Sequence, residues 1–144
     1  YEGTTQLQVV AAIRHVLTGT YAALVENYQQ LPVAEELQPQ KKLLDEMFAK
    51  YQEAVEKVKS INDTDYTDFM ARHLVEMAGG CVMGWLMITD ATRNLDSADA
   101  AVKEAAAELA NSAKVYINLA YADANRNAAF VANVTPVDLA EYKA

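Results

Sequence analysis

Two histidines are the first candidates for chemistry in this sequence. His73 lies three residues before Glu76, and on a helix this spacing places both side chains on the same side. Helical bundles that bind two iron ions use a Glu-x-x-His motif on each of two helices, together with two further glutamates. Here the order is reversed and no second copy occurs, so a structural polar pair is favoured and a metal site is the weaker alternative. His15 has no acidic residue within one turn and is expected at a surface or an interface.

A single cysteine, Cys81, lies in an apolar segment without a cationic neighbour that would lower the pKa of its thiol. We therefore predict a buried, unreactive thiol. Gly80 and Gly84 lie four residues apart around it, on one side of a helix, and Gly79 adjoins them. Because a glycine inside a helix costs about 1 kcal/mol relative to alanine, these positions indicate the close approach of a neighbouring helix. That helix belongs either to the same domain or to a partner subunit.

The last long helical segment carries a face that is polar but uncharged. We interpret this face as a surface that packs against other protein rather than as a catalytic surface. No phosphate-binding loop, nucleophile triad or metal cage is recognisable in the sequence. The residues of this polar face are Tyr116, Asn118, Tyr121, Asn125 and Asn127.

Four helical segments must position these side chains. In each segment apolar residues recur every three or four positions, which is the period of an amphipathic helix. Long helices joined by short turns pack as antiparallel neighbours. We therefore predict an all-α fold, an up-down-up-down antiparallel four-helix bundle with long helices. The segments run over residues 4–30, 39–61, 64–93 and 97–133.

The boundaries of the segments follow from residues that begin and end helices. Gly19 interrupts the first segment and either ends the helix or bends it. Thr64 or Asp65 suits the N-cap of the third helix, and Ser97 or Asp99 suits that of the fourth. The residues that follow the fourth helix are expected to form a short tail.

The composition narrows the classes of function. The chain of 144 residues carries 12 Lys and Arg against 20 Asp and Glu, a formal net charge of −8. This charge disfavours the capture of nucleic acid or of an anionic membrane. The longest nearly apolar run, residues 78–88, is shorter than the ~20 residues that span a bilayer, and a single cysteine suits a reducing compartment. We expect a cytoplasmic domain without a nucleic-acid partner and without a membrane span.

The first eight residues, YEGTTQLQ, resemble a segment near the end of the catalytic core of acyl-CoA dehydrogenases. Residues 9–17 resemble the last helix of that core. Two later segments are similar to the helical C-terminal extension that some bacterial members carry. They are HLVEMAGGCVMGWLMITDATRN, residues 73–94, which resembles its central helix, and FVANVTPVDLAEYK, residues 130–143, which resembles its closing segment.

This resemblance implies a role for each of residues 2–6. Glu2 aligns with the catalytic base that removes the α-proton of an acyl thioester, and Gly3 with a position where the backbone approaches the substrate. Thr4, Thr5 and Gln6 align with positions that bind FAD through hydroxyl, amide and helix-start N–H groups. No metal ligand is implied.

The resemblance also implies how the chain is organised. Residues 1–18 would form the last loop and helix of the catalytic core, and residues 19–144 a C-terminal helical bundle. The parent would be a longer FAD-dependent enzyme that oxidises an acyl-CoA to a trans-2-enoyl-CoA and passes electrons to an electron-transfer flavoprotein. The chain by itself is then expected to be inactive, to bind no cofactor and to have a structural role in a homo-oligomer. The alternative is a free-standing four-helix interaction or ligand-binding module.

Overall fold

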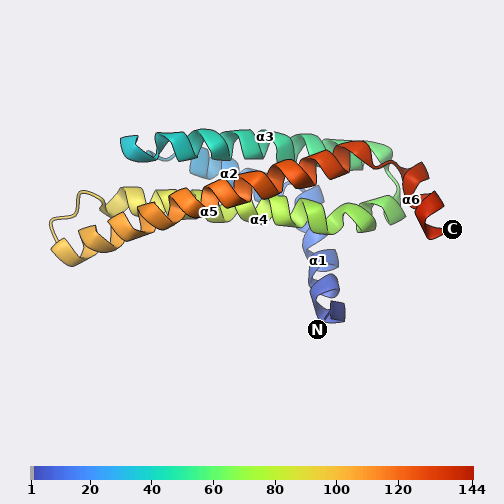
Figure 1. Cartoon of the computed structure of the whole chain (residues 1–144), viewed down its shortest axis with the longest axis horizontal. Coiled ribbons are helices and arrows are strands. Elements are labelled where there is room, and N and C mark those ends of the chain that lie inside the picture. Colours follow the sequence, from blue (N-terminus) through green and yellow to red (C-terminus); the bar gives the residue numbers. More distant parts are fainter. Residues whose placement is uncertain (1) are drawn as a thin grey trace.

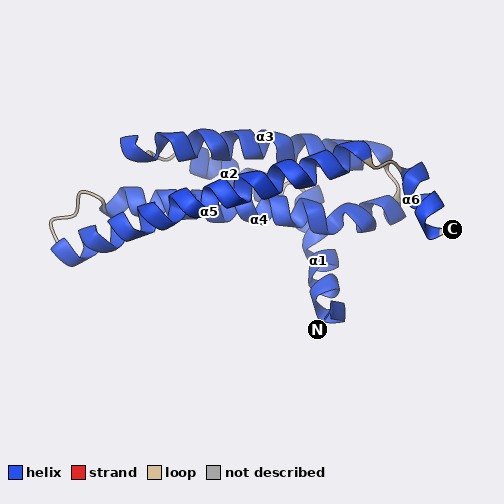
Figure 2. Cartoon of the chain, in the orientation of Figure 1, coloured by secondary structure: helices blue, strands red, loops and turns tan. Residues whose placement is uncertain are grey.

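A computed structural model describes the backbone of residues 2–144 and the side chains of residues 8, 9 and 11–144. Throughout the described backbone the regular structure is helical (Figure 2), which confirms the all-α prediction. The elements are α1 (Glu2–Leu17), α2 (Thr20–Gln29), the short 3-10 helix η1 (Glu35–Leu37), α3 (Gln38–Ile61), α4 (Thr64–Asn94), α5 (Ala100–Asn133) and α6 (Pro136–Lys143).

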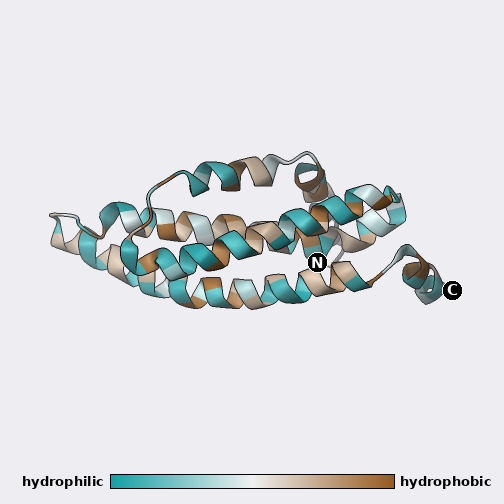
Figure 3. Cartoon of the chain, turned by 90° about the horizontal axis from the view of Figure 1, so that it is seen from above, coloured by the Kyte–Doolittle hydropathy of each residue, from teal (hydrophilic) through white to brown (hydrophobic). Residues whose placement is uncertain are grey.

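Three long helices form the body of the molecule. α3, α4 and α5 pack against one another and run antiparallel to their neighbours along the chain (Figure 1). Hydrophilic and hydrophobic residues alternate along these helices (Figure 3), as in amphipathic helices. α4 is the central element, because it packs against α1, α2, α3 and α5.

The predicted first long helix is divided into two. Gly19 adopts the left-handed conformation, with a φ of 83°, and separates α1 from α2. Glycine takes this conformation at little cost because it has no Cβ. α1 projects from the side of the molecule, whereas α2 lies along the long helices (Figures 1 and 3). The structure therefore has three long helices where the sequence predicted four, and the 10-residue α2 packs beside them.

The N-caps of the long helices lie close to their predicted positions. Asp63 caps α4, and its side chain accepts a hydrogen bond from the backbone N–H of Tyr66 at 2.8 Å. The predicted caps, Thr64 and Asp65, are therefore one and two residues too late. Asp99 caps α5, which confirms one of the two predicted alternatives, Ser97 and Asp99.

The predicted tail is a helix. The Thr135 side chain accepts a hydrogen bond from the backbone N–H of Asp138, and the Asp138 carboxylate accepts one from the backbone N–H of Thr135. This reciprocal pair is a capping box, which starts a helix by satisfying two free backbone donors. Leu139 of α6 is buried and anchors the helix to the body.

The C-terminal end of α5 is held by two side chains from other helices. The ammonium group of Lys57 in α3 donates hydrogen bonds to the backbone carbonyls of Val131 and Ala132, at 2.6 and 2.7 Å. The hydroxyl of Tyr66 in α4 donates to the carbonyl of Val134 at 2.6 Å. A cation at this end also complements the helix dipole, so these contacts join the three long helices where α5 ends.

Among the described residues, α4 is long and apolar enough, by length and composition, to cross a membrane. In the structure 56% of its apolar window is buried inside the molecule. Because core helices have the same length and composition, its position among four other helices accounts for its apolar character.

Glycines on α4 permit close packing within the domain. A Cβ added to Gly84 would lie 2.5 Å from Cδ2 of Leu44 in α3 and 3.2 Å from Cγ1 of Ile117 in α5. A Cβ added to Gly80 would lie 3.5 Å from the Cβ of Ala120. The predicted close approach is thus made by α3 and α5 of the same domain. The face that α5 buries consists of Ala106, Ala110, Ala113, Ile117, Ala120, Ala124, Asn127 and Val131.

Candidate functional site

The segment predicted to carry catalysis lies at the start of α1. The backbone of Glu2 begins that helix, on the part of α1 that projects from the body (Figure 1). The side chains of Glu2, Gly3, Thr4, Thr5 and Gln6 lie outside the described residues, and their roles stay predictions. The first backbone N–H groups of any helix have no partner within the helix, so this segment presents donors at its start.

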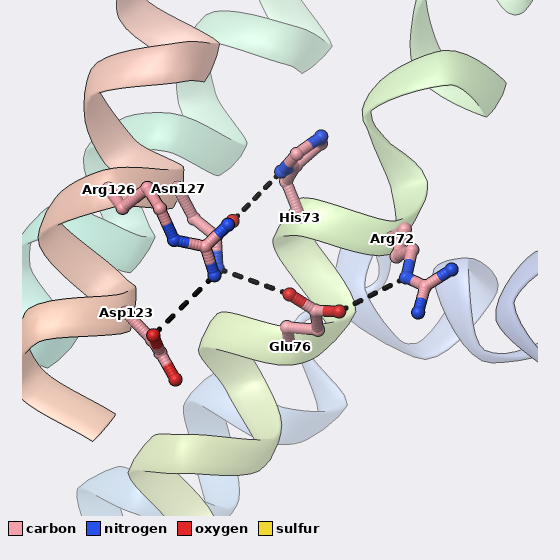
Figure 4. A network of polar contacts seen from close by, with 6 residues as sticks. All are labelled: Arg72, His73, Glu76, Asp123, Arg126 and Asn127. Atoms are coloured by element: carbon pink, nitrogen blue, oxygen red, sulfur yellow. Dashed lines mark hydrogen bonds and ion pairs between the residues drawn. The ribbon is translucent and has the colours of Figure 1, made fainter. Parts of the chain in front are cut away.

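A polar network connects α4 and α5 (Figure 4). His73 and Glu76 lie on the same side of α4, as their spacing predicts, and both contact the side-chain amide of Asn127 in α5. Nδ1 of His73 lies 2.8 Å from Oδ1 of Asn127, and Nδ2 of Asn127 donates to Oε2 of Glu76 at 3.4 Å. Nε of Arg72 donates to Oε1 of Glu76 at 3.1 Å. The pair is therefore joined through an amide from the neighbouring helix.

Asn127 makes this network part of the core. It is only 1% exposed, and a buried amide is costly unless its donor and acceptor are both satisfied. Because Oδ1 can only accept, Nδ1 of His73 carries the proton of this hydrogen bond. The His73 ring also stacks on Phe130, with ring centroids 4.5 Å apart. These contacts support the interpretation of His73 and Glu76 as a structural polar pair.

The alternative of a metal site finds little support in the geometry. Within the part of the chain that the structure describes, no group of three or more His, Cys, Asp or Glu side chains is placed to hold a metal ion. Glu76 already accepts hydrogen bonds from Arg72 and Asn127.

A groove of about 470 Å³ runs between α4 and α5 beside the network. Gly79 and Gly80 line it, and Met83 and Leu119 contribute apolar side chains. Tyr116 also lines it, and burial raises the pKa of this phenol, so the group stays neutral at physiological pH. The groove suits the docking of an apolar surface. Its polar lining residues are Glu76, Asp123, Arg126 and Asn127.

Cys81 is buried, as predicted. Its side chain is 1% exposed, and burial raises the pKa of the thiol from 9.0 to about 12. Because the thiolate is the reactive form, this cysteine is unsuited to nucleophilic chemistry.

The residues of the polar face predicted on α5 point in different directions and contact different helices. Tyr121 donates a hydrogen bond to Glu46 of α3 at 2.7 Å, and Asn125 accepts one from Lys50 of α3. Asn127 faces α4 instead, and Asn118 is exposed and bonds to its own helix. Much of this face therefore packs within the domain. Lys50 and Glu46 were not identified from the sequence, since nothing local to residues 46–50 signals contacts 75 positions away.

The sequence matches the model of a family described as "Acyl-CoA dehydrogenase C terminal" over residues 17–139. The chain belongs to this family. A solved structure, described as the acyl-CoA dehydrogenase family protein from Porphyromonas gingivalis, has 34% sequence identity and a TM-score of 0.72, and the match covers 88% of this chain and 99% of that one. No curated protein matches the chain.

Membership of the acyl-CoA dehydrogenase C-terminal family confirms the resemblance seen in the sequence. The match contains the network around Asn127, the α4–α5 groove and the buried Cys81. It begins at Leu17, so the octet lies ahead of it. The family assignment therefore rests on the helical body, independently of the motif at residues 1–8.

Proposed function

We propose that this chain is the C-terminal helical domain of an FAD-dependent acyl-CoA dehydrogenase. The observation that carries the proposal is the family match over residues 17–139, which lies after an octet, residues 1–8, that resembles the end of the catalytic core. Two independent stretches of sequence thus point to the same kind of enzyme, in the order expected along its chain. Residues 1–18 belong to the core in this proposal, and residues 19–144 to the C-terminal domain.

The first residues have the chemistry that the reaction requires. Glu2 supplies a carboxylate, which acts as a base on the α-carbon of an acyl thioester if its pKa is raised by its surroundings. Gly3 allows the backbone to approach the substrate closely. Thr4, Thr5 and Gln6 belong to the first turns of α1, and hydroxyl and amide residue types beside the free backbone N–H groups of a helix start suit the binding of FAD. The flavin, when bound, supplies the hydride acceptor.

The parent enzyme would oxidise an acyl-CoA to a trans-2-enoyl-CoA and reduce an electron-transfer flavoprotein in the cytoplasm. The helical body has an architectural role in this proposal, in a homo-oligomer of the parent. It supports no step of the reaction by itself, because one base without a flavin and a substrate pocket cannot move a hydride. Flavin reduction by the 144-residue chain alone would contradict this division of labour.

The test is a visible absorption spectrum of the full native gene product, recorded before and after the addition of acyl-CoA. We expect a flavin spectrum that bleaches with substrate. Glu2→Gln in that protein should keep the flavin bound and abolish the bleaching. Glu26→Gln, which changes an exposed carboxylate of α2, is the matched control and should leave it intact. A colourless gene product would favour the alternative, a free-standing interaction module.

A further inference from the structure

The outer face of α5 carries a second regular stripe of residues. Ten positions, separated by alternating steps of four and three, form one line along the helix, on a different face from the buried stripe. All ten are exposed, so neither α3 nor α4 covers them. They are Ala101, Ala105, Glu108, Ser112, Val115, Leu119, Ala122, Arg126, Ala129 and Asn133, and we call them the α5 outer stripe.

The composition of the α5 outer stripe is unlike that of a solvated surface. Val115 and Leu119 lie at its centre and are 73% and 61% exposed. Glu108 and Arg126 are its charged members, and the remaining positions are small or uncharged. Arg126 also forms an exposed ion pair with Asp123 of the same helix at 3.5 Å. In a chain of net charge −8, an apolar centre flanked by one acid and one base indicates a surface that is covered. Steps of four and three are the spacing with which one helix packs along another.

We propose that the α5 outer stripe binds the same stripe of a second copy, antiparallel, about a two-fold axis midway between Val115 and Leu119. In this arrangement each residue of the stripe faces the partner residue that lies equally far from the axis in the opposite direction along the chain. Val115 faces the partner's Leu119, Ser112 faces the partner's Ala122, and Glu108 faces the partner's Arg126. A two-fold interface repeats each contact, so the dimer has two ion pairs around an apolar centre.

Charge complementarity selects this register over its neighbours. If the axis lay between Ser112 and Val115, Glu108 would face the partner's Leu119 and its charge would lack a counter-ion. If it lay between Leu119 and Ala122, Val115 would face the partner's Arg126. A surface that matches itself in only one register specifies a closed dimer rather than an open chain of subunits.

The groove between α4 and α5 extends the surface sideways. Leu119 belongs both to the α5 outer stripe and to the lining of that groove, beside Met83, which is 45% exposed. The glycines at 79 and 80 leave the groove open to the apolar side chains of the second copy. The stripe is about 48 Å long at 1.5 Å per residue. With a width of about 10 Å it buries roughly 500 Å² per subunit, and the groove brings this towards the ~800 Å² of a standard interface.

The inference deepens the architectural role proposed above, since it names the surface through which copies associate, and it is independent of the flavin chemistry. Sedimentation equilibrium of the 144-residue chain, from about 1 to about 200 µM, measures it directly. We expect a monomer–dimer equilibrium. Arg126→Glu places like charges opposite each other on both sides of the apolar centre and should weaken the dimer by about tenfold to a hundredfold.

The matched variants separate this pairing from other kinds of association. Glu108→Arg should weaken the dimer as Arg126→Glu does, and the double variant with both changes should regain it. Lys103→Glu changes the net charge by the same amount at an exposed position of α5 outside the stripe, and should have no comparable effect. A wild-type chain that stays monomeric throughout, or a double variant that does not recover, would overturn the proposal.

Cysteine pairs then test the register. Ser112→Cys with Ala122→Cys should give a disulfide-linked dimer under mild oxidation, since the new thiol at position 112 faces the new thiol at position 122 of the second copy. The two positions are ten residues apart on one helix, about 15 Å, too far for a bond within one chain. Ser112→Cys with Ala129→Cys, which mismatches the register, should cross-link far more slowly. Equal rates for the two pairs would exclude the antiparallel pairing.

The outcomes separate this inference from the proposed function. A gene product that binds flavin and bleaches with acyl-CoA, but whose isolated chain fails the charge-swap test, would retain its enzymatic assignment and lose the interface. A colourless gene product whose isolated chain passes the charge-swap test would lose the enzymatic assignment and retain the interface.

Discussion

The contact between α4 and α5 is built in two different ways at two places along it, which we call the apolar end, around Gly84, and the polar end, around Asn127. Around Gly84 the helices approach closely because one side chain is missing, and the site is apolar. Around Asn127 the same helices are joined by hydrogen bonds from an amide to His73 and Glu76. The difference separates two sources of specificity. The apolar end selects the helix spacing by shape, whereas the polar end selects the register by pairing donors with acceptors.

The largest effect is expected for the reactivity of Cys81, at the apolar end. A pKa raised from 9.0 to about 12 lowers the thiolate fraction at pH 8 by about a thousandfold. A variant with Ala98→Cys adds an exposed thiol in the turn before α5 as an internal control. A thiol reagent should modify one thiol quickly and Cys81 only after the addition of denaturant. Two equally fast thiols in the folded chain would contradict burial.

The raised pKa of Cys81 also determines how the stability of the domain changes with pH. The folded domain keeps Cys81 protonated between pH 9 and about 12, where the unfolded chain loses this proton. Its contribution to stability is therefore complete below pH 9 and is lost as the pH rises towards 12. Burial also raises the pKa of Tyr51, which acts in the same direction. Denaturation midpoints measured from pH 8 to 11 should fall, and Cys81→Ala should flatten part of that fall.

Gly84→Val should be the most destabilising of the substitutions compared here. Its side chain would enter the space of Leu44 and Ile117, which are both fully buried, and overpacking of this kind costs about 3 kcal/mol at the upper end of its range. Urea denaturation followed by circular dichroism measures the change. Gly79→Val is the matched control, because a Cβ at Gly79 meets nothing within 4 Å. Similar losses for both would show that helix propensity rather than shape decides the apolar end.

Asn127→Ala should remove the polar end at a cost of about 2 kcal/mol, because it leaves His73 and Glu76 without their buried partner. Asn118→Ala is the matched control on the same helix. Asn118 is exposed and bonds to the carbonyl of Lys114, so its loss should stay within about 0.5 kcal/mol. Denaturant titrations of the two variants give the comparison. If they were equally stable, the network would contribute nothing beyond its burial.

The smallest effect should be a gain. Gly79→Ala adds a methyl group where nothing lies within 4 Å, on a helix where alanine is preferred to glycine by about 0.5–1 kcal/mol. The melting temperature should therefore rise by a few degrees, in contrast to the loss at Gly84, five positions further along the helix. A fall would indicate that the groove at Gly79 is filled in solution.

The sequence predicted the helices well and their partners poorly. Apolar spacing located the long helices to within a few residues, because period and capping residues are local properties. Val115 and Leu119 belong to the apolar pattern from which the helix over residues 97–133 is predicted, yet they are exposed. Apolar period identifies large residues as core, whereas most of the residues that α5 buries are alanines. Alanine carries too weak a signal to mark the buried stripe, so the inner and outer faces of α5 could not be distinguished.

The candidate site divides in the same way. The spacing of His73 and Glu76 predicted correctly that they share one side of a helix. Their partner Asn127 was noticed as polar, but a contact across 54 residues has no local signature. The sequence predicted that Gly19 either ends the first helix or bends it. It could not decide between the two, because glycine adopts positive and negative φ angles with similar ease.

The joint at Gly19 has a consequence for how this domain tolerates insertions and deletions. α1 is one continuous helix up to that joint, so a residue added or lost within it turns whatever precedes it by about 100° and shifts it by about 1.5 Å relative to the body. Deletion of a single codon ahead of Ile13 and Val16, the buried residues of α1, would leave the helical body packed as it is and still reorient the start of α1 relative to it. We therefore expect the length of this segment to be under stronger selection than the identity of most of its exposed residues.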